Sequence, residues 1–379
     1  MSAANPSLTA LMTVYNGGRY LRQAVESVLS QTYSDFEFLI VDDCSSDGSL
    51  DVLKSLRDPR IRIISNLFNQ GQTRSLNTGL REARGEYVAR IDADDVALPN
   101  WLERQMEFAK RRPDCVVWSA WAYVIDEEGR VRRLLKVPTT DEGIRLRSLT
   151  ATPINHGGCL MRREAIVAVG GYREDLKVVA DYELWSKLLR DGYKLAAQPI
   201  PLMGIRFHGG SISVAKKYDV VARETIEVMR TNMTTLTGTD FGPQKAGLLW
   251  KVIYDEENIS EEDFIGGRVL LAQIFERIKS EWKVGVSAQA AHIAGQLRAV
   301  DGKRALALIR RRDPTAFIRL ADVMARDASG RGRAFMMRSA ALFGIPGLAL
   351  MARIFDFVRR QEAGFLFGRE GSFRDHAGK

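Results

Sequence analysis

The first hundred residues alternate short apolar runs with segments whose apolar positions recur at helical spacing. The run 8–14 is apolar, and the segment 19–30 that follows it carries Leu21, Val25 and Val28 on one helical face. The same succession predicts further strands at 36–41, 61–64 and 87–91 and further helices at 49–56 and 72–84. Strands that alternate with helices through short links predict an α/β fold with a mostly parallel sheet and helices on both faces.

Polar residues gather where these predicted strands end. Thr13 and Tyr15 end the first strand, Asp43 follows the second, and Asp92 to Asp95 end the fourth. Open parallel sheets bind their ligands outside the carboxyl ends of the strands. We therefore expect these side chains on one rim of the sheet.

A nucleotide suits such a rim. Tyr15 can stack on a base, Asp43 can accept a hydrogen bond from a base N–H, and Arg74 can pair with a phosphate. Taken singly, each residue also has a structural explanation, as a half-buried aromatic, a turn former and a solvated helix residue. Their occurrence together on one rim favours the nucleotide.

Three carboxylates crowd the end of the fourth strand. Asp92 and Asp94 are two residues apart, so in an extended backbone they project to the same side. A hard divalent cation, Mn²⁺ or Mg²⁺, would offset their repulsion and leave coordination positions for the oxygens of a diphosphate. The alternative is a solvated acidic turn, because short motifs of this kind are often coincidental.

Several spaced motifs resemble, in order and spacing, the family 2 glycosyltransferases with a GT-A fold. They span residues 7–215 and comprise the segments 12–16, 30–33, 38–48, 69–71 with Asn77, 85–86 and 91–95. The resemblance implies an inverting transferase that takes a nucleotide-diphosphate sugar, with a UDP-sugar the expected donor, and a divalent cation. By position it implies these roles: Thr13, Tyr15 and Asp43 at the base, Arg74 at the nucleotide, Asp92 at the ribose or metal, and Asp94 on the metal.

The segment 178–185 resembles the stretch that carries the family's catalytic base, with Asp181 at the base position. This chain has Ala180 where an acidic residue is common in the family. An inverting displacement needs a carboxylate that takes the proton of the acceptor hydroxyl. The alternative is that Asp181 only caps the helix that follows.

The segment 204–213 resembles the family's closing Arg-x-His-x-x-Ser-x-Ser stretch. His208 is the expected further metal ligand, and Arg206 is expected to bind the donor and offset leaving-group charge. His156, before paired glycines, and Trp185, near Asp181, are candidates for the acceptor or sugar region. Packing in the interior is the alternative for both.

The composition is compatible with a globular enzyme of this kind. Of the 379 residues, 45% are hydrophobic and 27% charged, as in ordinary globular proteins. We expect a cytoplasmic protein, since we find neither a secretory signal pattern nor an apolar run of the roughly 18 residues that span a bilayer. Cys44, Cys115 and Cys159 lack the spacing of a disulfide framework or a zinc site.

Positive charge concentrates in the last third of the chain. Residues 264–379 contain 21 Lys and Arg against 10 Asp and Glu, which is a net charge of +11. Since the whole chain has a net charge of +8, residues 1–263 have a net charge of −3. We predict a catalytic domain at 1–215 and a basic α-helical region at 216–379. The apolar segment 340–351, flanked by arginines, is a candidate for peripheral contact with the inner face of the cell membrane. Plain helical packing is the alternative.

Three functional classes remain open. The first is a transferase that glycosylates a hydroxyl of a glycan or a lipid-linked acceptor, as in bacterial surface polysaccharide synthesis. The second is a sugar nucleotidyltransferase, although the stretch 15–19 is a poor version of its basic phosphate loop. The third is a non-catalytic nucleotide-sugar-binding protein, which would be expected to have lost Asp94 or Asp181. Nucleic-acid binding is not expected, since no recognised module accompanies the basic residues.

Overall fold

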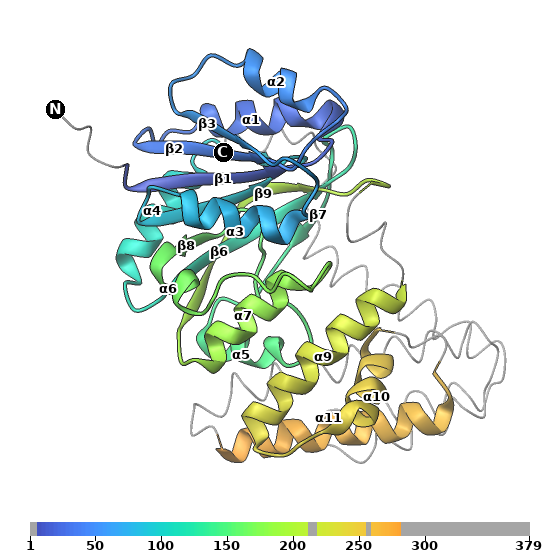
Figure 1. Cartoon of the computed structure of the whole chain (residues 1–379). Coiled ribbons are helices and arrows are strands. Elements are labelled where there is room, and N and C mark those ends of the chain that lie inside the picture. The colour runs from blue at the N-terminus through green and yellow to red at the C-terminus, as the bar shows by residue number, and fades with distance from the viewer. Residues whose placement is uncertain (1–5, 211–217, 255–258, 282–379) are drawn as a thin grey trace, which may run out of the picture. The chain divides into compact units, whose positions relative to one another are not determined.

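A computed structural model describes residues 6–210, 218–254 and 259–281 (Figure 1). The chain divides into two compact units. Among the described residues the first unit runs to Glu224, and the second begins at Thr225.

The first unit is built on one nine-stranded sheet. Its strands lie in the order β3-β2-β1-β4-β8-β6-β9-β5, and β7 pairs with β6 on the side. The pairs β3–β2, β2–β1, β1–β4 and β6–β9 are parallel, whereas β8, β5 and β7 pair antiparallel to their neighbours. The strands are β1 (Leu8–Val14), β2 (Phe36–Asp42), β3 (Ile61–Ser65), β4 (Tyr87–Asp92), β5 (Val96–Ala97), β6 (Val117–Ile125), β7 (Val131–Leu135), β8 (Leu160–Arg162) and β9 (Leu195–Arg206).

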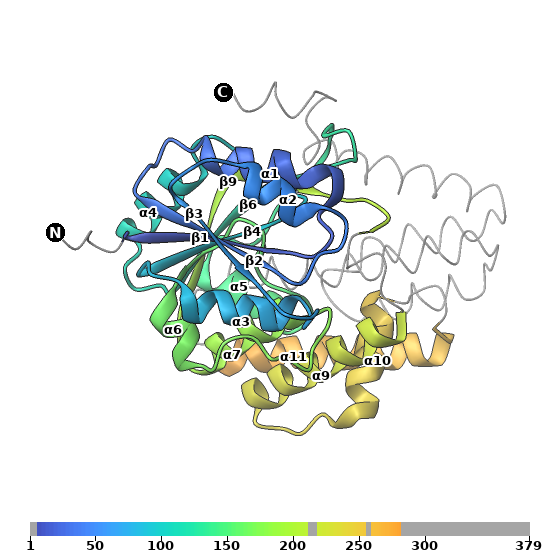
Figure 2. The same cartoon turned by 45° about the horizontal axis from the view of Figure 1, so that its top comes forward.

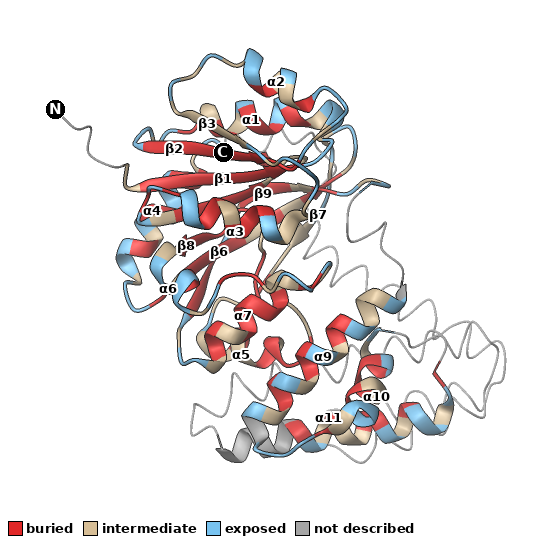
Figure 3. Cartoon of the chain, viewed as in Figure 1, coloured by how far each residue is buried: buried red, intermediate tan, exposed pale blue. Residues whose placement is uncertain are grey.

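The central strands are apolar on both sides because helices cover both faces of the sheet (Figure 2). Every residue of β1 and β2 is buried (Figure 3). One face packs against α1 (Leu21–Leu29), α2 (Ser49–Ser55) and α4 (Trp101–Arg111). The other packs against α3 (Gln72–Glu82), α5 (Asp141–Ser148), α6 (Arg163–Ala168) and α7 (Ala180–Arg190).

The link between α3 and β4 requires glycine at one position. A Cβ on Gly85 would lie 2.5 Å from the backbone nitrogen of Thr9 in β1. Backbone atoms cannot withdraw as a flexible side chain can, so any larger residue would displace the start of β4 from β1. The position of β4 matters because its far end carries Asp92 and Asp94.

These elements confirm the predicted fold class. The first four predicted strands and the helices between them are present, with ends shifted by at most two residues, apart from the predicted helix 19–30, whose first residues form a 3₁₀ turn at Gly18–Tyr20 before α1. The second unit, described by itself, contains α10 (Gly242–Tyr254) and α11 (Glu261–Glu281), and α9 (Tyr218–Thr237) runs from the first unit into it. α9, α10 and α11 all lie within the region 216–379 that was predicted to be helical. The part of that region after residue 281, with the segment 340–351, lies outside the described residues.

No helix within the described ranges is long and apolar enough to cross a membrane.

Candidate functional site

The carboxyl ends of β1, β2, β4 and β9 lie on one rim of the sheet, and the predicted site residues collect there. Thr13 stands directly beside Asp92 in the β1–β4 register and beside Val41 in the β1–β2 register. Thr13 is 9% exposed, whereas Tyr15, two residues further on, is 55% exposed. The structure thus brings the first, second and fourth strand ends together, as the apolar pattern predicted.

The loops that leave β1 and β2 are tied to each other. The backbone N–H of Asn16 donates to the Ser45 hydroxyl at 3.0 Å, and that of Gly17 donates to the Ser49 hydroxyl at 2.9 Å. Asn16 and Cys44 are the two non-glycine residues with positive φ within the described ranges, at 52° and 63°. Backbone strain of this kind persists where surrounding contacts impose it, and it is frequent at binding sites.

Asp43 anchors a third loop to the rim. Its buried carboxylate accepts hydrogen bonds from Asn66 Nδ2 at 2.7 Å and from the backbone N–H groups of Gln70 and Gly71 at 2.9 and 2.8 Å. Two of these bonds go to Oδ1 and one goes to Oδ2, which leaves Oδ2 with acceptor capacity. The predicted contact with a base N–H therefore remains compatible with this arrangement.

Asp92 forms an ion pair inside the protein. Both of its oxygens contact the guanidinium of Arg90, whose side chain is 4% exposed, and Oδ1 also accepts from Gln72 Nε2 at 3.2 Å. Burial raises the pKa of Asp92, and the charge of Arg90 opposes that rise. Asp92 is consequently neutralised by the chain itself, which reduces its capacity to bind a cation.

Asp94 faces His208 across the rim. Asp94 Oδ2 lies 2.9 Å from His208 Nε2, and the backbone N–H of Gly210 donates to His208 Nδ1 at 3.1 Å. Because Nδ1 accepts, the proton of the neutral imidazole is on Nε2 and points to Asp94. The two side chains that were predicted to share a metal, from positions 114 residues apart, are thus in contact.

Asp95 points into the interior beside them. Its Oδ1 accepts from the backbone N–H of Arg206 at 2.8 Å, whereas its buried Oδ2 has no hydrogen-bond partner. Burial raises the pKa of Asp95 well above the usual value, and the charges of Asp92 and Asp94 raise it further.

Arg206 is buried beside the acidic turn. Its guanidinium donates to the backbone oxygens of Asp94, Asp126 and Glu127 at 2.9, 2.8 and 3.1 Å and to Gln23 Oε1 at 2.9 Å. With its side chain buried and its donors engaged, Arg206 holds the backbone of the acidic turn in place. This geometry does not support the predicted contact between Arg206 and the donor.

Arg74 is exposed and engaged with a neighbouring carboxylate. Its Nε donates to Glu174 Oε2 at 3.1 Å, with side chains that are 52% and 43% exposed. An exposed ion pair of this kind exchanges easily with another anion. Arg74 therefore stays a candidate phosphate contact, with Glu174 as its competitor.

Asp181 lies in the first turn of α7, whose N-cap is Val179. Its Oδ2 accepts from the Thr152 hydroxyl at 3.2 Å. Burial raises the pKa of Asp181, and the backbone N–H of Tyr182, the Thr152 hydroxyl and the charge of Arg90 oppose that rise. Val179, and not Asp181, occupies the N-cap position, although the Asp181 carboxylate interacts with the backbone N–H of Tyr182 in the first turn. A carboxylate with a raised pKa, near the ion pair of the strand-end motif, has the properties of a general base.

His156 and Trp185 pack against each other. His156 Nε2 lies 2.7 Å from the Tyr172 hydroxyl, and the centroid of its ring lies 5.7 Å from that of Trp185. Burial lowers the pKa of His156 well below the usual value, so the imidazole is neutral. Trp185 is fully buried. Its indole contacts the His156 ring in the interior, and half-buried His156 is the better placed of the two for the predicted contact with a sugar or the acceptor.

The side chains present suit a cation that is shared with a ligand. Within the described ranges no three His, Cys, Asp or Glu side chains converge as a preformed metal site. Asp94 and His208 supply two ligands at one point, and the unpartnered Asp95 Oδ2 lies near them in sequence. Two protein ligands leave the other positions to diphosphate oxygens and water, which is usual for Mg²⁺ at phosphates. Ligation by His208 Nε2 requires its proton to move to Nδ1, so the contact from Gly210 must open.

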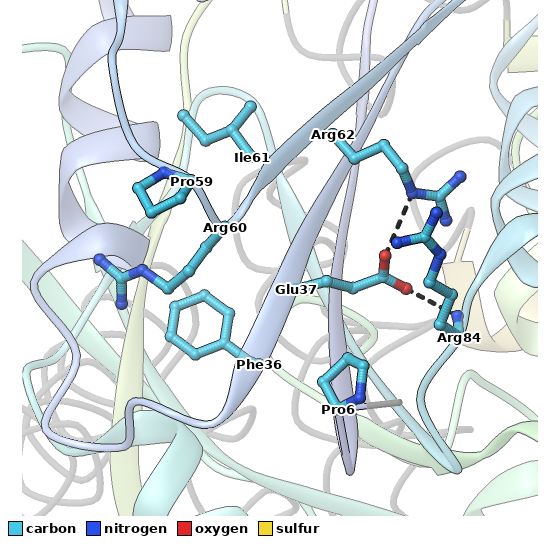
Figure 4. Close-up of a pocket in the computed structure, with 8 residues that line it drawn as sticks. All are labelled: Pro6, Phe36, Glu37, Pro59, Arg60, Ile61, Arg62 and Arg84. Carbon is cyan, nitrogen blue, oxygen red and sulfur yellow. Dashed lines mark hydrogen bonds and ion pairs between the residues drawn. The ribbon is translucent and has the colours of Figure 1, made fainter. Parts of the chain in front are cut away.

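A separate pocket of about 360 Å³ lies at the amino ends of β2 and β3, on the rim of the sheet opposite the candidate site (Figure 4). Arg62 Nε donates to Glu37 Oε2 there at 3.1 Å, and the backbone N–H of Arg84 donates to Glu37 Oε1 at 2.6 Å. Glu37 thus balances the charge of Arg62. None of the predicted site residues lines this pocket.

Several contacts of the site were not foreseen from the sequence. Arg90, Gln72, Glu174 and Thr152 each touch a predicted site residue, and Arg90 acts on both Asp92 and Asp181. The contact of Arg90 could have been found, because an arginine two residues before Asp92 is unusual in a strand that is otherwise mostly apolar. The others contact partners 20 to 100 residues away, which spacing does not reveal.

The chain is similar in sequence to known glycosyltransferases. Residues 9–170 match the family model described as glycosyl transferase family 2. The putative glycosyltransferase EpsE of Bacillus subtilis is 34% identical over 197 residues, which cover 50% of this chain and 69% of that protein. The amylovoran biosynthesis glycosyltransferase AmsE of Erwinia amylovora is 26% identical over 220 residues, or 57% and 82% of the two chains.

A solved structure shares the fold. S. aureus TarS 1–349, crystallised in complex with UDP-GlcNAc, superposes with a TM-score of 0.53 at 16% identity, covering 80% of this chain and 87% of that one. The family model and the sequence relatives favour a glycosyltransferase over the nucleotidyltransferase and the non-catalytic binding protein. The chain belongs to glycosyltransferase family 2, and it is a glycosyltransferase with a GT-A-like α/β fold.

Proposed function

We propose that the enzyme inverts the anomeric centre of a UDP-sugar while transferring the sugar to a hydroxyl of a glycan or a lipid-linked acceptor. One observation carries this proposal: buried Arg90 pairs with Asp92 at the strand end, and its charge also acts on Asp181, about ninety residues further along the chain. This supports a base for the acceptor and a site for the donor diphosphate in the same region of the first unit. The relative named for amylovoran biosynthesis supports a role in making a surface polysaccharide.

In the proposed step the acceptor oxygen attacks the anomeric carbon as the bond from that carbon to the diphosphate oxygen breaks. The nucleoside diphosphate leaves with the electron pair, and Asp181 takes the proton of the acceptor hydroxyl. A raised pKa makes Asp181 a stronger base, and the Thr152 hydroxyl holds the carboxylate in place.

On the donor side, we assign the base to Thr13, Tyr15 and Asp43, the phosphates to Arg74, and the ribose side to Asp92. Asp94 and His208 would hold a Mn²⁺ or Mg²⁺ ion, with Asp92 at most in its outer shell because Arg90 already neutralises it. Such an ion supplies charge neutralisation for the leaving diphosphate. His156, held by Tyr172, is the proposed contact for the sugar or the acceptor.

We further propose that residues after about 215 form a basic helical region that meets the membrane surface peripherally. The support is the net charge of +11 after Phe264. Attraction to anionic headgroups contributes ~1 kcal/mol per basic residue near the surface and is screened by salt. Co-sedimentation with anionic liposomes that weakens as salt rises would support this, and equal, negligible binding to anionic and neutral liposomes would contradict it.

The catalytic proposal is tested with Asp181→Asn. Wild type and variant are incubated with Mn²⁺ and a panel of UDP-glucose, UDP-galactose and UDP-GlcNAc, and UDP release is measured. The amide keeps the size of the side chain but cannot accept the proton, so turnover should fall on the order of 10² to 10⁴-fold, with UDP affinity kept. Near-normal turnover by the variant would refute Asp181 as the base.

A further inference from the structure

The segment that leads into α7 determines the position of Asp181 in the first turn of that helix. Val179, the N-cap of α7, makes no side-chain capping bond, and the residue after it is Ala180. The first N–H groups of a helix and of the turn before it then require other acceptors. In this chain the N–H groups of the turn before α7 find them on a different helix.

Glu224 of α9 supplies that acceptor. Glu224 is buried, with 3% of the residue exposed. It accepts from the backbone N–H groups of Lys177 at 3.0 and 3.1 Å, of Val178 at 2.9 Å and of Val179 at 3.3 Å. A negative charge at this place also interacts favourably with the positive end of the α7 dipole. One side chain thus fixes three consecutive backbone groups directly before the turn that carries Asp181.

The residues just before this segment are held by α3. The Thr73 hydroxyl donates to the backbone oxygen of Leu176 at 3.1 Å, and Asn77 Nδ2 donates to that of Tyr172 at 2.8 Å. Gly171, which precedes Tyr172, has φ +67°, and a Cβ there would lie 2.6 Å from Asn77 Oδ1. The segment before α7 is therefore held by α3 at residues 172–176 and by Glu224 at residues 177–179.

We propose that Glu224 is a positioning residue for the general base, acting through the backbone of residues 177–179. All the atoms involved belong to the first unit, which among the described residues runs to Glu224. The catalytic unit therefore needs the first turns of α9 to place its base. A fragment that ends at residue 215 would bind nucleotide but transfer sugar poorly.

This inference rests on the proposed role of Asp181, and the test separates the two. Full-length Glu224→Ala removes every acceptor, whereas Glu224→Gln retains one oxygen and should rescue part of the effect. Glu227→Gln is the matched control, since Glu227 is an exposed acidic residue one turn later on the same helix and makes none of these contacts with residues 177–179. Asp181→Asn is measured alongside them.

Three quantities are measured: UDP release from the best UDP-sugar with Mn²⁺, UDP affinity by calorimetry, and hydrogen exchange in the peptide 172–182. For Glu224→Ala we expect kcat to fall on the order of 10²-fold, as for a displaced catalytic group, with UDP affinity within about twofold. Exchange at residues 177–179 should rise on the order of tenfold. Glu224→Gln should fall between Glu224→Ala and wild type, and Glu227→Gln should match wild type.

Two results would overturn the inference: unchanged exchange at residues 177–179 in Glu224→Ala, or a kcat no lower than that of Glu227→Gln while Asp181→Asn is inactive. If Glu224→Ala does not fold, Glu224→Gln carries the same comparison. Wild-type turnover in Asp181→Asn would refute the proposed function itself, which is a different outcome.

Discussion

Replacing Thr152 by valine should move the pH dependence of the reaction without lowering its maximum. The Thr152 hydroxyl donates to Asp181 Oδ2 at 3.2 Å, and this bond stabilises the ionised carboxylate. Valine has the same shape but no donor. The protonated form of Asp181 then becomes relatively more favourable, so the pKa of Asp181, already raised by burial, rises further.

The geometry limits the size of this effect. Hydrogen bonds to charged groups contribute about 1.5 to 3 kcal/mol. The bond is long, and the hydroxyl also lies 3.4 Å from the Ile154 oxygen, so we take the lower end of that range. Since one pKa unit corresponds to about 1.4 kcal/mol, the acid limb of the rate profile should move up by about one pH unit.

The assay is UDP release as a function of pH for wild type and for Thr152→Val. At pH values below the limb the base is protonated, so the variant should be about tenfold slower there. Above the limb both enzymes have an ionised base, and their rates should converge. Thr150→Val is the control, because the Thr150 hydroxyl donates to the backbone oxygen of Arg147 at 3.5 Å and not to Asp181. A variant whose rate is lowered equally at every pH would refute the account of Asp181 as a titrating base.

Two further predictions concern the donor side. Glu174→Gln frees Arg74 from an exposed ion pair worth at most ~1 kcal/mol, so UDP should bind up to about fivefold more tightly in calorimetry; weaker binding would contradict this. At pH 8 iodoacetamide should label Cys44 alone, since burial raises the pKa of Cys115 to about 11 and that of Cys159 to about 12. UDP with Mn²⁺ should slow the labelling of Cys44. Two labelled thiols in the folded protein would contradict the prediction.

The sheet was predictable where local pattern decides the structure. β1, β2 and β4 are buried on both faces, and such strands appear in a sequence as continuous apolar runs between turn residues. β5 has two residues and β8 has three, and both pair antiparallel with strands that are distant in sequence. Segments this short carry no periodicity, so only the tertiary structure defines them.

The site was predictable as a set of residues but not as a set of contacts. The strand-end rule and the family resemblance selected Asp43, Asp94 and His208, which the structure places on the rim. The same reasoning assigned Arg206 to the donor because a charge near a diphosphate suggests a phosphate contact. The burial of Arg206 among backbone oxygens depends on how α1 and the turn after β6 pack. The contact of Glu224 with the segment before α7 could not be predicted either, because Glu224 lies on a helix beyond the family motifs.

The most direct test of the central claim is calorimetry of UDP binding to wild type and to Asp94→Ala, each with and without Mn²⁺. If the rim holds the diphosphate through a cation at Asp94 and His208, wild type should bind UDP tightly only with Mn²⁺. Asp94→Ala should lose that metal-dependent gain while keeping its thermal unfolding temperature. Equal affinity of the two proteins in the presence of Mn²⁺ would contradict the claim that this rim is a metal-dependent donor site.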